Sequence, residues 1–410
     1  MNAPRPRSLL LWSAFALAAL LLALPAAGHA ASATPAPVPL GFFGVAVHET
    51  TWTAADPDAE FRRMRVDGVE SVTASIYWHD AQPYPDAASV PPERAAEFAP
   101  APDGIPTTFV AADRLYAQAA RNGLRVLPVI NGAAPWARLD PERTWSPPAD
   151  PEAYGRFVGL LVQRYGRGGT FWAAHPELPA LPTRDWQIWN EPAGGQGKTS
   201  TSYFWDADLP FEPRYVAMLR ASRAAARAAD PQARTLIGGL LGRAWDSAEQ
   251  MYAGGAQPYF DGIALHPYTR KPQDVVLSVR LVRRVMRAHG DNAKPIVLTE
   301  FGWPSSVGRV PANRGYGFEK TRRGQAAVIA AALPLLAKAR KALRLTGVYW
   351  YTWAGRDTDL LDIFDYSGLR TVLPSGEVVP KPAEKIFRQT VRSLEGCAVA
   401  ATKRPARCRR

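Results

Sequence analysis

Cysteine and histidine are scarce in this chain, and their scarcity excludes several kinds of site. Two cysteines and six histidines occur among 410 residues. Cys397 and Cys408 both lie near the C-terminal end, so neither a cysteine-rich metal site nor a thiol nucleophile is predicted within the body of the chain. In an exported protein these two cysteines would close a short disulfide loop, and free thiols are the alternative.

Other absences narrow the class of protein. No Gly-x-Gly-x-x-Gly turn follows the first expected strand, so a dinucleotide-binding fold has little support and no cofactor is expected. No segment beyond the N-terminal region looks like a membrane span. With 47% hydrophobic and 21% charged residues, the composition is that of a globular protein with a substantial core, and we expect a monomer.

The N-terminus has the residue order of a secretory signal. Arg5 and Arg7 precede an apolar stretch at 9–24, and small residues follow it. This order predicts a signal peptide over residues 1–31, followed by a Pro/Ala-rich linker at 32–39. We therefore expect a secreted or cell-surface protein with no stable membrane insertion after cleavage, and a retained anchor is the alternative.

The net charge of +12 is concentrated at the two ends of the chain rather than on its body. Residues 395–410 form a basic tail, with positive charges at Lys403, Arg404, Arg407, Arg409 and Arg410. A solvated tail is the favoured interpretation, and contact with an anionic surface such as a cell-wall polymer or lipid head groups is the alternative. A nucleic-acid partner is not expected.

Apolar strand-like runs alternate eight times with helical patterns between residues 40 and 394. The expected strands are 41–48, 69–78, 124–130, 185–189, 235–239, 260–266, 295–299 and 347–351. The expected helices are 58–66, 110–122, 152–165, 213–229, 247–254, 274–289, 324–343 and 382–394. This alternation predicts the α/β fold class, as a single (β/α)₈ TIM barrel. Long loops are expected after strands, at 82–108, 133–150, 193–212, 301–321 and 354–380.

Two of the expected strands end in a glutamate. Glu191 ends the run Trp-Gln-Ile-Trp-Asn-Glu-Pro on the fourth strand, and Glu300 ends Ile-Val-Leu-Thr-Glu on the seventh. Parallel strands bring their C-terminal ends to one rim of a barrel, so the two carboxyl groups are predicted to face each other there. Glycoside hydrolysis needs such a pair, one protonated and one ionised.

These motifs resemble those of the clan A retaining glycoside hydrolases over the whole expected barrel. The similarity is greatest to the family 39 type, which includes bacterial exopolysaccharide endoglycosidases, with family 5 cellulases next. The resemblance implies that Glu191 is the general acid/base and Glu300 the nucleophile. It also implies that Asn190 binds the sugar 2-hydroxyl.

The sixth expected strand ends Leu-His-Pro-Tyr, which resembles the clan's His-x-Tyr arrangement near the nucleophile. Tyr268 could then donate a hydrogen bond to Glu300 and lower its pKa, while His266 could contact the substrate or Glu191. A structural role for His266 is the alternative. His48, at the end of the first strand, is a weaker candidate for substrate binding.

Tryptophans are candidates for stacking against sugar rings. Trp353 follows the eighth strand, where the resemblance implies a platform beneath the sugar at the cleavage point. Trp78, Trp136 and Trp303 follow the second, third and seventh strands and are candidate walls of the cleft. For these three, burial as loop anchors is an equally good interpretation.

Three competing functions remain open. A barrel that binds glycan without turnover would gain nothing from two desolvated like charges. A metal-dependent barrel hydrolase would need His-x-His on the first strand, which ends Val-Ala-Val-His, so no metal is expected. A binding module driven by the basic tail is the third. The resemblance favours internal cleavage of a β-linked polysaccharide, but the arginine that many clan members carry near the second strand end is lacking, so no sugar is assigned.

Overall fold

The computed structural model describes residues 37–193, 204–205, 211–398 and 406–409. The chain divides into two compact units, residues 1–36 and 37–410. The first unit, which contains most of the predicted signal peptide and linker, lies outside the described residues. The fold is therefore that of the second unit.

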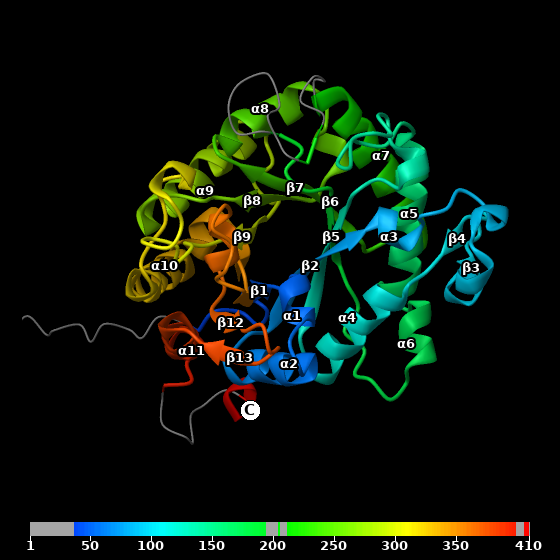
Figure 1. Cartoon of the computed structure of the whole chain (residues 1–410). Helices are drawn as coiled ribbons and strands as arrows, with labels where there is room; N and C mark the ends of the chain where they lie inside the picture. The colour runs from blue at the N-terminus through cyan, green and yellow to red at the C-terminus, as the bar shows by residue number, and fades with distance from the viewer. Residues whose placement is uncertain (1–36, 194–203, 206–210, 399–405, 410) are drawn as a thin grey trace, which may run out of the picture. The chain divides into compact units, whose positions relative to one another are not determined.

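Eight parallel strands close into a barrel (Figure 1). Around the barrel they are β1 (Phe43–Ala46), β10 (Leu345–Trp350), β9 (Ile296–Phe301), β8 (Gly262–His266), β7 (Arg234–Leu241), β6 (Asp185–Ile188), β5 (Arg125–Asn131) and β2 (Ser71–Tyr77). Each neighbouring pair is parallel, so all eight C-terminal ends lie on one rim. The predicted (β/α)₈ barrel is confirmed.

A helix follows each strand and covers the outside of the barrel (Figure 1). In chain order these are α2 (Pro57–Val66), α4 (Val110–Arg121), α5 (Pro151–Tyr165), α7 (Phe211–Ala229), α8 (Ala244–Ala253), α9 (Pro272–Ala288), α10 (Arg322–Leu343) and α11 (Pro382–Leu394). Local chemistry sets their starts. The side chain of Asp150, for example, accepts hydrogen bonds from two backbone amides in the first turn of α5, and proline at the first helical position suits the helix geometry.

Alternating strand residues divide the core into two parts. Leu127, Leu236, Val297 and Tyr349 face inward and form a small cluster inside the barrel. The residues that face outward join the large core between strands and helices. The four side chains of the small cluster occupy the barrel interior, and the strand ends at the C-terminal rim lie beyond them.

Shorter elements decorate the C-terminal rim. These are α1 (Glu49–Trp52), α3 (Trp78–Ala81), η1 (Ala87–Ser89), η2 (Pro92–Glu97), β3 (Ala99–Pro100), β4 (Pro106–Thr107), η3 (Pro135–Ala137), η5 (Ala312–Arg314), β11 (Ala354–Gly355), η6 (Ile363–Tyr366), β12 (Arg370–Val372) and β13 (Val378–Pro380). On the opposite side α6 (Thr170–Ala174) precedes β6, and η4 (Gln257–Tyr259) precedes β8. Much of the expected loop 193–212 lies outside the described residues.

The end of the tail contacts the segment before β1. A disulfide joins Cys397 and Cys408, and η8 (Ala406–Arg409) contains the second of these cysteines. The guanidinium of Arg407 donates to the carbonyl oxygens of Val38, at 2.7 Å, and Glu395, at 3.3 Å. The tail thereby connects the entrance of the first strand to the exit of α11.

Within the described residues, no helix combines the length and apolar character that a membrane span needs. The apolar stretch 9–24 lies outside those residues, so the expected cleavage or anchoring of this stretch stays a prediction.

Candidate active site

The segment after β6 turns sharply and places Glu191 on the rim. Trp189 and Glu191 have φ angles of 66° and 43°, a left-handed region that non-glycine residues rarely adopt. The backbone amide of Trp189 donates to Ile130 at 2.9 Å, and its indole N–H donates to the carbonyl of Phe204 at 2.6 Å. A Cβ at Gly238 would lie 2.3 Å from the Trp189 carbonyl, so only glycine leaves room for this turn. Strain of this kind is concentrated at functional sites.

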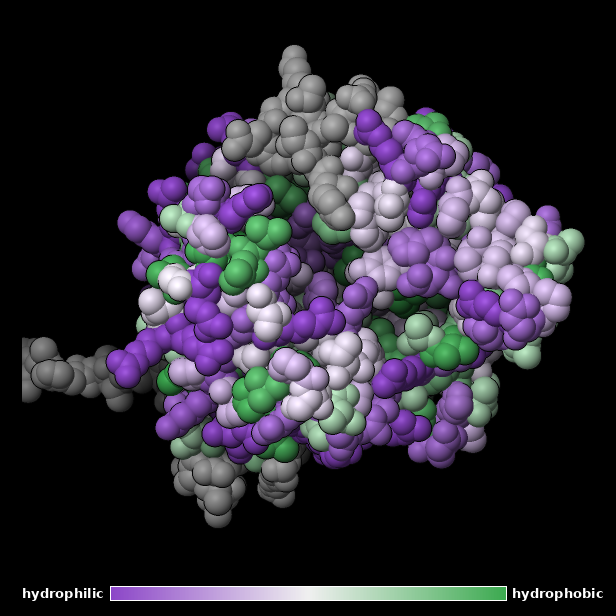
Figure 2. Space-filling view, in the orientation of Figure 1, coloured by the Kyte–Doolittle hydropathy of each residue, from purple (hydrophilic) through white to green (hydrophobic). Residues whose placement is uncertain are grey.

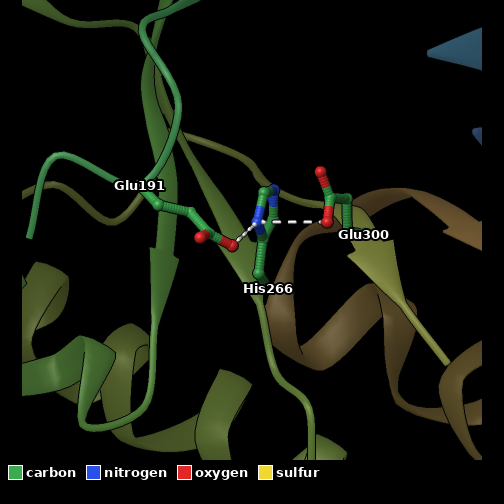
Figure 3. A group of neighbouring side chains, drawn as sticks. All are labelled: Glu191, His266 and Glu300. Carbon is green, nitrogen blue, oxygen red and sulfur yellow. Dashed lines mark hydrogen bonds and ion pairs between the residues drawn. The ribbon is translucent and has the colours of Figure 1, made fainter. Parts of the chain in front are cut away.

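Glu300 lies on β9 and faces Glu191 across His266 (Figure 3). Nδ1 of His266 forms a hydrogen bond with Oε1 of Glu191 at 2.6 Å and lies 3.5 Å from Oε2 of Glu300. One oxygen of each glutamate and a ring nitrogen of His266 lie within 4.8 Å of one another. Both glutamate side chains are 16% exposed, whereas the imidazole is fully buried. Two carboxyl groups from opposite parts of the sequence thus share one imidazole.

Gly239 makes room for that imidazole. A Cβ at Gly239 would lie 2.3 Å from the ring atoms of His266. The pairing of β7 with β8 shifts register between Ile237 and Leu240, and irregular pairing of this kind is common beside active sites. On its other side the ring places Nε2 at 3.0 Å from the hydroxyl of Thr299, which fixes the orientation of the ring.

The charge on His266 depends on its two carboxylate neighbours. Burial alone would lower the pKa of His266, but the carboxylates of Glu300 and Glu191 outweigh burial and raise this pKa above its ordinary value. The two acids therefore favour the protonated form of the imidazole between them.

Tyr268 holds the second carboxylate. Its hydroxyl donates to Oε2 of Glu300 at 2.7 Å, the contact that the sequence predicted. Burial raises the pKa of Glu300 to about 7, and the charge of Glu191 adds to that rise. His266 and the Tyr268 hydroxyl oppose it, because both stabilise the ionised form. Tyr268 does lower the pKa of Glu300, as expected, but burial raises this pKa by more.

Asn190 lies in the same turn as Glu191 and is 6% exposed. Its side-chain oxygen is 3.5 Å from the amide nitrogen of Gln187, which donates toward it. The structure thus places Asn190 beside Glu191, its neighbour in the Asn-Glu-Pro motif. Its predicted contact with a sugar hydroxyl stays a prediction.

Three of the four candidate tryptophans do not face the mouth of the barrel. Trp78, Trp303 and Trp353 are fully buried. Each indole N–H has an internal acceptor: Gln82 for Trp78, the carbonyl of Thr269 for Trp303, and Glu60 for Trp353. This burial matches the loop-anchor interpretation for Trp78 and Trp303, and the contact of Trp353 with a sugar stays a prediction.

Trp136 and His48 remain half-buried at the rim. The indole N–H of Trp136 donates to the carbonyl of Gln82 at 2.8 Å, and its ring packs edge-on against Trp78. His48 packs edge-on against Tyr351, with ring centroids 4.7 Å apart. Burial lowers the pKa of His48 to about 4, so this ring is neutral near pH 7. Both remain candidates for contact with a substrate.

Tyr351 is the aromatic residue that the sequence analysis missed. It directly follows β10, is half-buried, and lies 6.1 Å from the ring of Tyr268. Burial raises the pKa of Tyr351 well above its ordinary value, and the charges of Glu300 and Glu191 contribute. Together with His48 it lines a cavity of about 490 Å³. Strand alternation was the available signal, since Tyr349 faces inward and Trp350 outward.

The three central groups are also the one set in the described part of the chain whose donor atoms could surround a divalent cation. Their hydrogen bonding fits a metal poorly. A metal-ligating nitrogen must be deprotonated and free to bind the metal, whereas Nδ1 of His266 is engaged in a hydrogen bond with Glu191. The neighbouring carboxylates also favour the protonated imidazole. The arrangement suits proton transfer better than metal binding.

Comparison with known proteins relates the fold to glycoside hydrolases. No protein-family model and no curated protein matches the sequence. Among solved structures, a family 39 glycoside hydrolase from the gut symbiont Bacteroides cellulosilyticus matches with a TM-score of 0.57 and 17% identity. The match covers 87% of this chain and 64% of that one, so the chain spans under two thirds of that protein's length.

Two further solved structures agree. A GH39 enzyme from Xanthomonas axonopodis matches with a TM-score of 0.58 and 16% identity, over 86% of this chain and 66% of that one. A GH5_18 protein from Bifidobacterium longum matches with a TM-score of 0.55 and 14% identity, over 86% and 78%. The chain shares the fold of these proteins. At such low identity the likeness is one of fold, and the chemistry rests on the site itself.

Proposed function

We propose that the protein is a secreted, monomeric, retaining β-glycosidase that cleaves a poly- or oligosaccharide internally. The observation that carries the proposal is the placement of Glu191 and Glu300, whose nearest oxygens lie within 4.8 Å of each other on one barrel rim. Retaining enzymes hold their two carboxyl groups about 5–5.5 Å apart, whereas inverting enzymes leave room for a water between them.

In the first step Glu300 attacks the anomeric carbon while Glu191 protonates the departing glycosidic oxygen. Glu300 must be ionised for this step. The hydroxyl of Tyr268 and the positive charge of His266 both stabilise that ionised form. Glu191 supplies the proton in the same step, so the mechanism assigns it the role of acid.

In the second step Glu191 removes a proton from water, and the water attacks the glycosyl–Glu300 ester on the same face of the sugar. Esterification removes the negative charge of Glu300, so no second carboxylate charge opposes Glu191 when it acts as base. His266 contacts Glu191 at 2.6 Å throughout this exchange and can stabilise its ionised form. The product keeps the β configuration.

The remaining features of the proposal rest on other observations. Secretion is supported by the residue order at 1–31, and the Cys397–Cys408 disulfide fits an oxidising compartment. Cleavage within a chain fits an active site on a rim with several long loops. Gel filtration of the purified protein tests the monomer.

The test is activity on a panel of β-linked polysaccharides, with product sizes recorded and the anomeric configuration followed by NMR. Wild-type protein should give β products of several sizes, and a fluorosugar inhibitor should label Glu300. Equal activity of the Glu300→Gln variant would overturn the mechanism. Binding without cleavage would favour a glycan-binding barrel, and loss of activity in a chelator would favour a metal-dependent enzyme.

A further inference from the structure

A row of aromatic rings leads outward from the catalytic pair. Tyr268, which donates to Glu300, stacks against Phe318 with ring centroids 5.7 Å apart. Phe318 stacks in turn against Tyr316 at 6.2 Å, and the two planes are tilted by 27°. Phe364 lies 5.1 Å from Tyr268 and 6.2 Å from Tyr316. Tyr316 is thus two ring contacts away from the tyrosine that holds the candidate nucleophile.

The outer end of this row is far more exposed than its middle. Phe318 is 7% exposed, whereas the side chain of Tyr316 is 69% exposed. An aromatic ring left in water gains nothing for the stability of the fold. Figure 2 shows that this face is hollowed where the strands end, with hydrophobic side chains beside the hollow.

The loop that carries Tyr316 is held in place by its backbone. Between β9 and α10, the amide of Lys320 donates to Pro304 at 2.8 Å and the amide of Val307 donates to Lys320 at 3.1 Å. The carboxylate of Glu319 accepts hydrogen bonds from the amides of Tyr316 and Gly317. The exposed ring is therefore presented by an ordered loop, which lowers the entropy cost of binding against it.

A cavity lies beside the same row. It has a volume of about 490 Å³, and Tyr351 and Phe364 form part of its wall. Its other walls carry polar side chains, among them Arg356, Asp359 and Asp362. A sugar ring has an apolar face of C–H groups and an edge of hydroxyls, so it needs aromatic and hydrogen-bonding partners together.

We propose that the ring of Tyr316, supported by Phe318 and Phe364, binds a sugar unit of the substrate outside the cleavage point. This inference rests on the proposed glycosidase activity and extends it, because it makes the preferred substrate a chain rather than a single glycoside. Affinity should then rise as the chain becomes long enough to reach Tyr316.

The experiment compares wild-type protein with the Tyr316→Ala variant. The substrates are β-linked oligosaccharides of glucose, xylose and mannose, from dimers to hexamers, and the matching nitrophenyl glycosides. In wild-type protein kcat/KM should rise with chain length. Tyr316→Ala should lower kcat/KM on the longest cleaved oligomer about tenfold, the effect of one lost aromatic contact. Its loss on nitrophenyl glycosides should be much smaller.

Tyr259→Ala is the matched control, because this half-buried tyrosine lies in η4, before β8 and away from the C-terminal rim. It should show the wild-type dependence on chain length. The same oligomers are also titrated into Glu300→Gln protein with and without Tyr316→Ala, which measures binding without turnover. Wild-type dependence on chain length in the Tyr316 variant overturns the inference while leaving the glycosidase intact. Binding that weakens with Tyr316→Ala, without any cleavage by wild-type protein, supports the inference and rejects the glycosidase.

Discussion

Two clusters of buried carboxyl groups differ in how their charge is balanced. At the mouth of the barrel, Glu191 and Glu300 share the single imidazole of His266, and no arginine contacts Glu300 among the described residues. Outside the barrel, the carboxylate of Glu384 on α11 forms ion pairs with Arg63 on α2 and with Arg370 on β12, each at 2.6 Å. The second cluster has permanent positive charges, and the first has a titratable one.

The ion pairs around Glu384 extend to two further carboxyl groups. Arg370 also pairs with Glu60 at 2.9 Å, and Arg63 pairs with Asp67 at 3.2 Å. Burial raises the pKa of Asp67 to about 7, and Glu384 contributes to that rise. Burial raises the pKa of Glu300 to about 7 as well. A raised pKa therefore does not identify a catalytic carboxyl group by itself; access to a cleft and the absence of a permanent cation separate the two clusters.

The largest effect is expected from Glu300→Gln. The variant should lose about 10⁴-fold or more in kcat, because the nucleophile is removed. Its free energy of unfolding above pH 7 should not fall, since a neutral amide replaces a carboxylate whose ionisation burial opposes. Initial rates and urea titrations measure the two quantities. A variant that keeps more than a tenth of the activity would contradict the role of Glu300.

Glu384→Gln should lower stability and leave activity nearly unaltered, the opposite of what is expected for Glu300→Gln. It removes one of the two carboxylate partners of Arg370, which is 8% exposed, and also the partner of Arg63, so the free energy of unfolding should fall by about 3 kcal/mol. Activity per folded molecule should stay close to that of wild type. The exposed pair Arg94–Glu97 supplies the control, because Glu97→Gln should leave the unfolding transition nearly unaltered. If Glu384→Gln abolished activity without loss of stability, the distinction between the clusters would fail.

Tyr268→Phe should shift the acidic limb of the pH dependence of activity to higher pH. Activity should fall as pH drops through about 7, because Glu300 then becomes protonated. Without the Tyr268 hydroxyl the ionised form loses a hydrogen bond, so the pKa of Glu300 rises and the acidic limb of kcat/KM moves up by roughly one pH unit. A pH profile of kcat/KM measures the shift. A limb that stayed in place would show that another group limits activity there.

The last prediction concerns Asp67→Asn, which should alter stability and leave activity unaltered. In the folded protein Asp67 keeps its proton up to about pH 7, whereas in the unfolded chain it loses the proton near pH 4, about its ordinary value. Between those pH values the folded state binds more protons, so this group lowers the free energy of unfolding as pH rises. The variant should therefore gain stability relative to wild type from pH 4 to pH 7. Urea titrations across this range measure the difference, and a constant difference would contradict it.

The barrel and its pair of glutamates could be predicted because both depend on chain order. Apolar runs mark the strands, and counting them puts Glu191 after the fourth and Glu300 on the seventh. Contacts between side chains could not be predicted in the same way. The approach of His266 to both acids depends on the missing side chain of Gly239, on a neighbouring strand. A single sequence carries no signal for that fit.

The eighth strand ends earlier than expected. The expected strand 347–351 corresponds to β10, which ends at Trp350, so residues 351–353 lie beyond the regular alternation of side chains. Trp353 pairs with Glu60 in the outer core, while Tyr351 faces the mouth. Composition drew attention to tryptophan as a partner for sugar. At this rim, tyrosines combine an aromatic face with a hydroxyl that can bond to a carboxylate.

The tail has a mechanical consequence. Arg407, within the loop closed by Cys397 and Cys408, bonds to Val38 just ahead of β1 and so acts as a clasp between the two ends of the barrel. In a barrel, the first and last strands pair along a seam that no covalent link crosses locally. A pulling force on the chain ends would act on the Arg407–Val38 contact before it acted on the pairing of β1 with β10. The barrel would therefore resist opening from its ends.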